Sequence, residues 1–489
     1  MKNQIILFFA LMVTTMLSAN NITVSNLSLI GQNTTDDYSM VKFDISWENS
    51  WHISSVANNW DAAWVFVKYH ISEFNGGDGF WKHAWLNNTG NTAPSGSVID
   101  IGLLTPGTFF NATTNPGLGA FIYRNADGTG TFSLTNVKLR WNYGANGVDD
   151  NAVIDIQIYA IEMVYVPQGT FVLGSGGGEV NHFYKSPIST DTYSINTEAT
   201  ITVGTSENTL YYETGPYNLG GDQSGPIPAA FPKGYNAFYC MKYEISQQGY
   251  VDFLNSLTQT QATARKYDKP TDNYRYEIMG STVGSYATAN PYVACNWLNY
   301  ADVAAYLDWS GLRLMTELEF EKACRGTISA VNNEFAWGST SITQSTGITN
   351  SGLTNEVSMN NGNCATSNQT FVQGPMRVGV FATDSSTREH AGATYYGIME
   401  MSGNVWERAV TVGNAIGRAF DGTHGDGVLD EAGNANVSTW PTYSGVGFRG
   451  GAWDTGAYTF SPVSSRFYMN YGEIIRVNDN GGRGVRTAP

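Results

Sequence analysis

One stretch of the sequence carries the residue types of a cation site. It runs from Gly397 to Glu407, where two carboxylates, Glu400 and Glu407, bracket the pair Gly403-Asn404 and a tryptophan. Because Gly and Asn tolerate positive φ, this pair is expected to turn the chain tightly. Carboxylates and upturned backbone carbonyls are the oxygen ligands that calcium prefers. The alternative is a solvated loop whose tryptophan packs in the core.

Other blocks of the sequence give this stretch a context. They are EMVYVPQGTFVLG at Glu162–Gly174, FYCMKYE at Phe238–Glu244, GLRLMTELEFEKACRG at Gly311–Gly326, AWG at 336–338, VGVF at Val378–Phe381, FRGGAW at Phe448–Trp453 and GVR at Gly484–Arg486. Together with GNVWE at Gly403–Glu407, they resemble, in the same order, the signature blocks of the formylglycine-generating enzyme (sulfatase-modifying factor) family. Ordered blocks over roughly two thirds of a chain are far more specific than one motif.

The resemblance implies a fold for residues 161–489. The family's domain is a heavily looped relative of the C-type lectin fold with few helices, so we expect a mostly β chain with α+β character. Residues 20–160 show strand patterns only, such as the alternation of apolar and polar residues over 41–47. We expect an antiparallel β-sandwich of immunoglobulin-like size there. The linker at residue 160 is short, which favours a fixed arrangement of the two domains.

Three helices are expected in the C-terminal domain. Ser246 can cap the first of them, whose apolar residues recur at helical spacing. The second covers 301–310 and ends at Gly311, a residue suited to the position after a helix. The third opens with the capping box of Thr316 to Glu319 and runs to about Arg325.

The remaining sequence of this domain is rich in Gly, Asn and Thr. Residues 175–235 and 326–375 show the least pattern and are expected to be surface insertions. The four cysteines are Cys240, Cys295, Cys324 and Cys364. None has C-x-x-C spacing, so a zinc site is not indicated. Disulfides in any of three pairings, or buried free thiols, remain open.

The net charge and the N-terminal segment limit the partners and the location that can be expected. The 489-residue chain has a formal net charge of −16 and no basic stripe, which argues against a nucleic-acid partner. Residues 1–19 read as a secretory signal, with Lys2, a short apolar run and small residues before a cut after Ala19. No later segment is apolar enough to span a membrane. We expect an exported protein in the periplasm, at the cell surface or outside the cell.

The cysteine pair that carries out the family's characteristic reaction is absent from this sequence. The family's enzymes oxidise a substrate cysteine with a cysteine pair that follows the R-G-G-S-W block. Aligning on Arg449–Trp453 places that pair at Thr455 and Phe460, and no cysteine follows Cys364. Because this chemistry needs a thiolate, the sequence favours a non-catalytic binding or structural protein. The alternative is a sulfatase-modifying-factor-type enzyme that oxidises a substrate residue at an unrecognised site.

The resemblance also implies a cofactor. Members of the family bind calcium around the Gly-Asn turn with two side chains and two backbone carbonyls. By position these are the side chains of Glu400 and Glu407 and the carbonyls of Gly403 and Val405. We therefore expect calcium as the cofactor.

A ligand surface is expected at Trp453–Tyr471, because this segment lines the substrate cleft in the family's enzymes. The candidate residues are Trp453, Asp454, Thr455, Tyr458, Phe460, Arg466 and Tyr468. Aromatic and short polar side chains recognise partners at low entropic cost, so a protein or glycan partner at the cell exterior is expected. The alternative is that the aromatics fill the core. A homo-oligomer is left open.

Three arginines recur where the family's C-terminal half uses arginine, at Arg449, Arg466 and Arg486. One guanidinium can bind several loop carbonyls at once, so we expect these side chains to hold irregular backbone together. Ligand recognition in the cleft is the alternative role.

Overall fold

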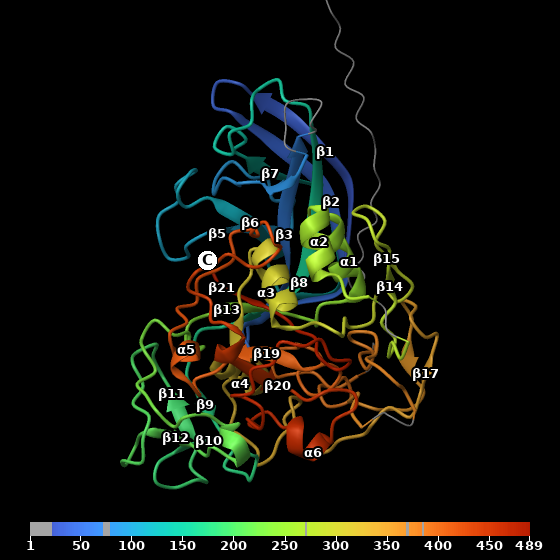
Figure 1. Ribbon diagram of the computed structural model, residues 1–489. Coiled ribbons are helices and arrows are strands. Elements are labelled where there is room, and N and C mark those ends of the chain that lie inside the picture. The colour runs from blue at the N-terminus through green and yellow to red at the C-terminus, as the bar shows by residue number, and fades with distance from the viewer. Residues whose placement is uncertain (1–21, 72–78, 269–270, 368–370, 384–385) are drawn as a thin grey trace, which may run out of the picture.

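The computed structural model describes residues 22–71, 79–268, 271–367, 371–383 and 386–489. The signal peptide expected at residues 1–19 lies outside these ranges. Figure 1 shows a β-rich N-terminal part, coloured blue to teal, joined to a wider part that consists mostly of loops. Within the described ranges, no helix is long and apolar enough to cross a bilayer.

The N-terminal part is built from one continuous antiparallel sheet whose two sections pack on a shared core and are here called the first and the second sheet. The first sheet contains β1 (Thr23–Asn33), β2 (Tyr38–Ile53) and β7 (Gly128–Trp141), and the second contains β5 (Ser97–Leu103), β6 (Gly117–Arg124), β3 (Asn59–Ile71), β4 (Trp81–His83) and β8 (Ile154–Val166). The β2–β3 hairpin joins them through two residue pairs, His52 with Trp60 and Ile53 with Asn59. Inward side chains such as Phe43, Val65 and Leu139 are fully buried between the sheets. The mostly β architecture expected from the sequence is confirmed.

The second sheet continues into the C-terminal part without a linker. The strand β8 pairs with β3 along residues 154–164 and then with β13 (Phe238–Met241), which in turn pairs with β21 (Val485–Thr487). The boundary expected at residues 160 and 161 therefore falls inside one strand. Side chains on both faces of β3 are buried, which explains its nearly continuous apolar sequence.

The C-terminal part contains the helices α1 (Gln247–Asn255), α2 (Gln259–Arg265), α3 (Tyr300–Trp309), α4 (Glu317–Arg325), α5 (Ala415–Arg418) and α6 (Ala457–Phe460). Of these, α1 and α3 pack on the face of this sheet that points away from the sandwich core. The caps expected at Ser246 and Thr316 are present, and Gly311 follows α3 with φ of 69°. The helix α2 was not among the three expected helices, although Thr258 and Gln261 form a capping box. Trp309 of α3 meets Phe66 of β3 edge to face, with 5.0 Å between ring centroids.

Short strands fix the loops around these helices. They are β9 (Phe171–Leu173) with β11 (Tyr193–Ile195), β10 (Phe183–Lys185) with β12 (Leu210–Tyr212), β14 (Ile278–Met279) with β15 (Ala287–Thr288), β17 (Ile348–Thr349) with β18 (Val357–Ser358), and the three-stranded sheet of β16 (Met315–Thr316), β19 (Glu407–Val410) and β20 (Val446–Arg449). The expectation of a surface insertion at 175–235 is wrong for its apolar residues. Phe183, Leu210 and Tyr212 are fully buried in the main core.

Buried arginines link loops that are far apart in the sequence, as expected for three of them. Arg449 Nη1 donates to the carbonyl oxygens of Val463 at 3.1 Å and Ser465 at 2.6 Å. Arg486 donates to the carbonyls of Gly311 and Leu103, and so joins the C-terminal strand to the sandwich. Such multiple bonds satisfy carbonyls that irregular backbone would otherwise leave unpaired. The expected bonds from these arginines to loop carbonyls are present, and their contribution to stability stays a prediction.

Candidate functional site

The Gly-Asn turn of the opening stretch forms as the sequence predicts. Gly403 and Asn404 have φ of 97° and 66°. A Cβ at Gly403 would lie 2.5 Å from the carbonyl oxygen of Ala365, so only glycine fits. The carboxylate of Glu244 holds the turn from the other side by accepting the Asn404 side-chain amide and, at 3.1 Å, the N–H of Val405.

The two glutamates that bracket the turn are buried, so the solvated-loop interpretation is wrong. Glu400 and Glu407 are 5% and 1% exposed. Glu400 Oε1 accepts the N–H of Gly379 at 2.8 Å, and Glu407 Oε1 accepts Arg483 Nε at 2.6 Å. Burial raises the pKa of each carboxyl to about 7. The second oxygen of each carboxylate, Oε2, has no hydrogen-bond partner in the part of the chain that the structure describes.

The backbone carbonyls assigned to the same cation are also without donors. No described residue donates a hydrogen bond to the carbonyl oxygen of Gly403 or Val405. No three His, Cys, Asp or Glu side chains within the described ranges form a metal-binding group, but the expected calcium site uses only two side chains. All four candidate ligand atoms are oxygens, the type that calcium prefers. The residues present therefore fit a calcium ion in kind, while Arg483 already offsets the charge of Glu407.

The positions of the missing cysteine pair are engaged in the fold. Thr455 Oγ1 accepts the N–H of Ala452 at 2.8 Å and donates to its carbonyl at 3.0 Å. The ring of Phe460 packs edge to face on Trp406 and is parallel to Tyr468, with centroid distances of 5.8 and 5.6 Å. Neither side chain offers a thiol.

No cysteine elsewhere replaces the missing pair. All four thiols are free and buried. Burial raises the pKa of Cys240 to about 12, and it raises the pKa of each of the other three thiols as well. A thiol held in its protonated form is a poor nucleophile, so the sulfur chemistry of the expected family has no evident site here.

The expected ligand segment divides into a support and a surface. Trp453 and Arg466 are 1% and 0% exposed, so these two candidates act from beneath the surface and do not face a partner. Arg466 pairs instead with Glu317, at 2.6 Å between Nε and Oε2. Asp454 and Thr455 are half-buried, and Tyr458 is 74% exposed.

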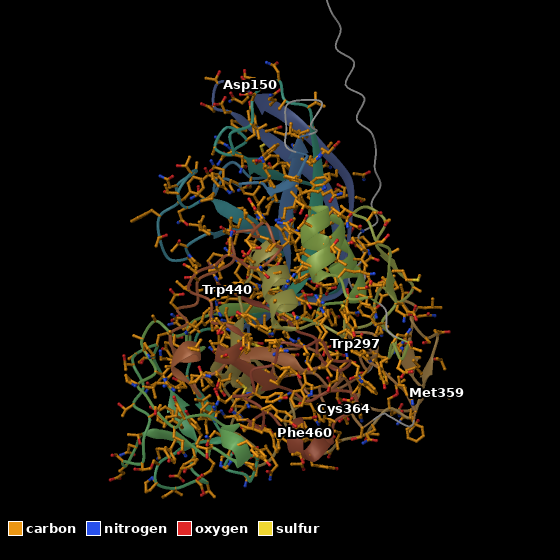
Figure 2. The ribbon with its side chains drawn as sticks, viewed as in Figure 1. Asp150, Trp297, Met359, Cys364, Trp440 and Phe460 are labelled. Atoms are coloured by element: carbon orange, nitrogen blue, oxygen red, sulfur yellow. The ribbon has the colours of Figure 1, made fainter. Side chains whose placement is uncertain are left out.

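We call the outer side chains of this segment the aromatic surface. It consists of Tyr458, Phe460, Phe467, Tyr468 and Tyr471. Four of these rings contact one another, as in the Phe467–Tyr468 pair at 4.6 Å, whereas the Tyr458 ring contacts Phe335 at 5.9 Å. In Figure 2, Phe460 lies at the end of the molecule opposite Asp150, which marks the tip of the sandwich. The aromatic surface is therefore remote from the N-terminal sheets.

A comparison with protein families now bears on this geometry. The family model described as a sulfatase-modifying factor enzyme 1-like domain matches residues 156–488. The chain belongs to this family. The match starts inside β8, so the sheet strand shared with the sandwich is the first element of the sulfatase-modifying factor domain. A search of curated proteins found no match.

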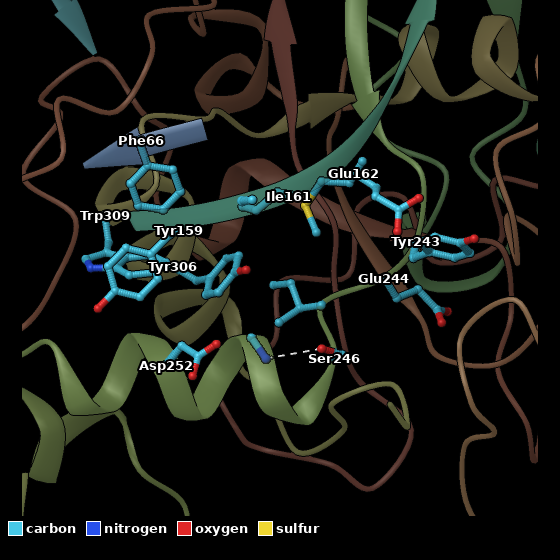
Figure 3. Close-up of a pocket in the computed structure, with 14 residues that line it drawn as sticks. Phe66, Tyr159, Ile161, Glu162, Tyr243, Glu244, Ser246, Asp252, Tyr306 and Trp309 are labelled. Carbon is cyan, nitrogen blue, oxygen red and sulfur yellow. Dashed lines mark hydrogen bonds between the residues drawn. The ribbon is translucent and has the colours of Figure 1, made fainter. Parts of the chain in front are cut away.

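A small cavity lies where the sulfatase-modifying factor domain meets the sandwich sheet. Figure 3 shows aromatic rings, including Phe66 and Trp309, at one end and Glu162, Tyr243 and Glu244 at the other. Its volume of about 50 Å³ is room for a few water molecules only. We interpret it as a packing gap between the two parts.

An ion-pair group closes the acidic end of this cavity. Lys242 Nζ lies 2.9 Å from Glu162 Oε2 and 3.3 Å from Asp61 Oδ2, and all three side chains are buried. Burial raises the pKa of Glu162 to about 7 in spite of the lysine. This group was not predicted, because its members come from three segments of the chain. Its only signal in the sequence is the presence of charged residues, Glu162 and Lys242, inside two apolar family blocks.

Proposed function

We propose that the chain is an exported, non-catalytic binding protein that is stabilised by calcium and recognises a protein or glycan partner through the aromatic surface. The proposal rests on the replacement of the two reactive cysteines of the family by Thr455 and Phe460. Where the family's enzymes hold reactive cysteines, Thr455 closes a turn and Phe460 joins a cluster of rings. Exposed aromatics on a rigid support are typical of recognition surfaces.

One observation favours the enzymatic alternative. The side chains of Asp454 and Asp479 share a hydrogen bond beside Thr455, and burial together with the neighbouring carboxyl raises the pKa of Asp479 to about 7. A carboxyl that keeps its proton at neutral pH can act as a general acid. Robust conversion of a cysteine peptide to formylglycine by the purified protein would favour this alternative over the binding function.

If the aromatic surface binds the partner, removal of its exposed rings should reduce partner capture. Changing Tyr458 and Tyr471 together to Ala is expected to weaken binding more than tenfold, because truncation of a central aromatic contact costs about 2 kcal/mol or more. Both rings are exposed, at 74% and 43%, so the fold should persist, as circular dichroism can check. The measurement is capture of partners from native extract by the immobilised protein.

The matched control is Phe109→Ala, an aromatic side chain that is 96% exposed on the sandwich. It is expected to capture the same partners as the parent. If the double variant also does so, the binding surface lies elsewhere.

The calcium site predicts a change in thermal stability. A ligand present at 100 times its Kd stabilises the folded state by about 2.7 kcal/mol, so calcium should raise the Tm and EDTA should lower it. Glu400→Gln removes one charged ligand and is expected to abolish most of the shift. Glu431→Gln, at an exposed glutamate, should leave it intact. A Tm that responds to neither calcium nor EDTA would rule out the site.

A further inference from the structure

A second, larger hollow lies in the C-terminal part, and its lining residues belong to none of the motifs singled out in the sequence. It has a volume of about 670 Å³, within the range of sites for small ligands. Its lining is mainly polar and includes Asp272, Asn273, Tyr274, Glu277, Asn290 and Gln373. We call it the polar pocket. Its size and its side chains distinguish it from the small cavity beneath the sandwich.

The backbone of one wall is held in a costly conformation. Tyr274 and Arg275 are consecutive residues with φ of 47° and 67°. The left-handed region costs a non-glycine residue about 1–2 kcal/mol. Asn296 holds this conformation with a 3.1 Å bond from its Nδ2 to the carbonyl of Tyr274. Gly374 packs so closely that a Cβ there would lie 2.2 Å from the same oxygen. Strain that the surroundings enforce in this way is concentrated at functional sites.

Trp297, another residue with positive φ, also supports this wall. Trp297 has φ of 60°, and its Nε1 donates to the carbonyl of Asn273 at 3.2 Å. Its ring stacks on Tyr267 with 5.0 Å between centroids. The wall that carries Asn273 and Tyr274 is therefore rigid, as a preformed binding site requires.

The charge of the lining decides which ligands fit. Arg275 is the one cation in the described lining, and it points to the buried carboxylate of Glu356, with Nη1 3.2 Å from Oε1. The same nitrogen donates to the carbonyl of Pro375 at 2.6 Å. With the guanidinium engaged there, Asp272 and Glu277 give the pocket an acidic character. Phosphate, sulfate and carboxylate ligands are disfavoured by that charge.

The remaining groups match a ligand with many hydroxyls. Asn273 Nδ2 donates to Glu277 Oε1 at 2.7 Å. Asn290 Nδ2 donates to the carbonyl of Arg275 at 2.9 Å, so these side chains are held in place in the wall. Carboxylate and amide oxygens have more than one lone pair, so those of the lining can also accept hydroxyl hydrogen bonds. The ring of Tyr274 adds an aromatic wall on which an apolar sugar face can pack. We propose that the polar pocket binds a neutral saccharide, of a size between one and a few sugar units.

This site is separate from the aromatic surface, although the two are linked. Tyr274 contacts Trp453, the buried start of the expected ligand segment, with 5.2 Å between ring centroids. The saccharide proposal does not rest on the proposed function, because each site can be disabled alone. The Tyr458 and Tyr471 double variant should keep saccharide binding.

An array of glycans tests the proposal with the full chain. The probes are neutral mono-, di- and trisaccharides and their sulfated or sialylated counterparts. The expected result is binding of one or more neutral probes, with weaker binding of the acidic counterparts. Failure of every neutral probe to bind, or preference for acidic probes, would overturn the proposal.

Substitutions then place the binding. The double variant Asp272→Ala and Glu277→Ala is expected to bind the best neutral probe at least tenfold more weakly in calorimetric titration. Glu207→Ala, at an exposed glutamate outside the lining, should bind as the parent does. If the double variant does not fold, Asp272→Asn gives the same test, because the change is isosteric and Asp272 is exposed. Equal affinity in a folded variant would show that the saccharide binds elsewhere.

Discussion

Replacing Arg466 with Met is expected to lower the free energy of unfolding by about 3–5 kcal/mol, since it removes the nearer cation from a buried carboxylate and leaves Arg449, at 3.9 Å. The carboxylate of Glu317 is fully buried and accepts Arg466 Nε at 2.6 Å and Nη2 at 3.0 Å. The guanidinium also donates to the carbonyl of Asn181 at 3.1 Å and stacks between the rings of Phe183 and Tyr212. Methionine would keep much of the packing and none of the pairing.

Arg408 provides a matched control with the opposite expectation. It is as deeply buried as Arg466, at 0% exposure, but none of its three guanidinium nitrogens has a hydrogen-bond partner within the described residues. Burial lowers its pKa to about 10, although its cation lies 4.1 Å from the ring centroid of Phe448. Replacing an unsatisfied buried charge with an apolar side chain of similar volume is neutral or stabilising, by about 1–4 kcal/mol. We therefore expect Arg408→Met to be at least as stable as the parent.

Urea unfolding of both variants measures the difference. The midpoint should fall for Arg466→Met and stay or rise for Arg408→Met, with unchanged m-values. Equal losses would contradict the claim that hydrogen-bonded pairing, and not burial of an arginine as such, stabilises this fold.

Local features of this fold were predictable from the sequence. The caps at Ser246 and Thr316 and the turn at Gly403-Asn404 depend on side chains within three or four residues. The roles of Arg449, Arg466 and Arg486 followed from the family resemblance, and the structure gives each of them the expected carbonyl partners. The cation site was assigned by position in the same way. Among the described residues, no donor reaches Oε2 of Glu400, Oε2 of Glu407 or the carbonyls of Gly403 and Val405. Calcium binding there stays a proposal.

Long-range features were not predictable. Asp61, Glu162 and Lys242 form one ion-pair group although they are far apart in the sequence. No sequence period marks a strand such as β8 that two domains share. The polar pocket was not predictable because its lining comes from short polar segments without regular structure. Its shape also depends on positive φ at Tyr274 and Arg275. Burial of Trp453 and Arg466 likewise depends on loops that close over them.

The shared sheet gives the second large prediction. A chain that begins at Glu162 keeps nearly all of the sulfatase-modifying factor match but loses β3 and β6, and we expect it not to fold cooperatively. Trp64, Phe66 and Phe121 are fully buried against the C-terminal part. An aromatic side chain buries about 150–250 Å², worth roughly 4–6 kcal/mol at 25 cal/mol per Å² as an upper estimate. Three such side chains match the whole stability of a typical domain, about 5–15 kcal/mol.

Polar contacts across the same interface add to this loss. Trp64 Nε1 donates to the carbonyl of Ser310 at 2.8 Å, and Lys68 Nζ donates to that of Gly427 at 2.7 Å. Removing the sandwich would also leave Lys242 without Asp61 and would uncover Arg486, which now lies over the ring of Trp64. The shortened chain should bind a hydrophobic dye and lack near-UV circular dichroism, whereas a chain shortened only by residues 1–21 should melt as the parent does. A sharp melting transition with native near-UV circular dichroism in the chain from Glu162 would contradict this expectation. The core of the C-terminal part would then form without the sheet face of the sandwich, and the sandwich would be an addition to a self-sufficient domain.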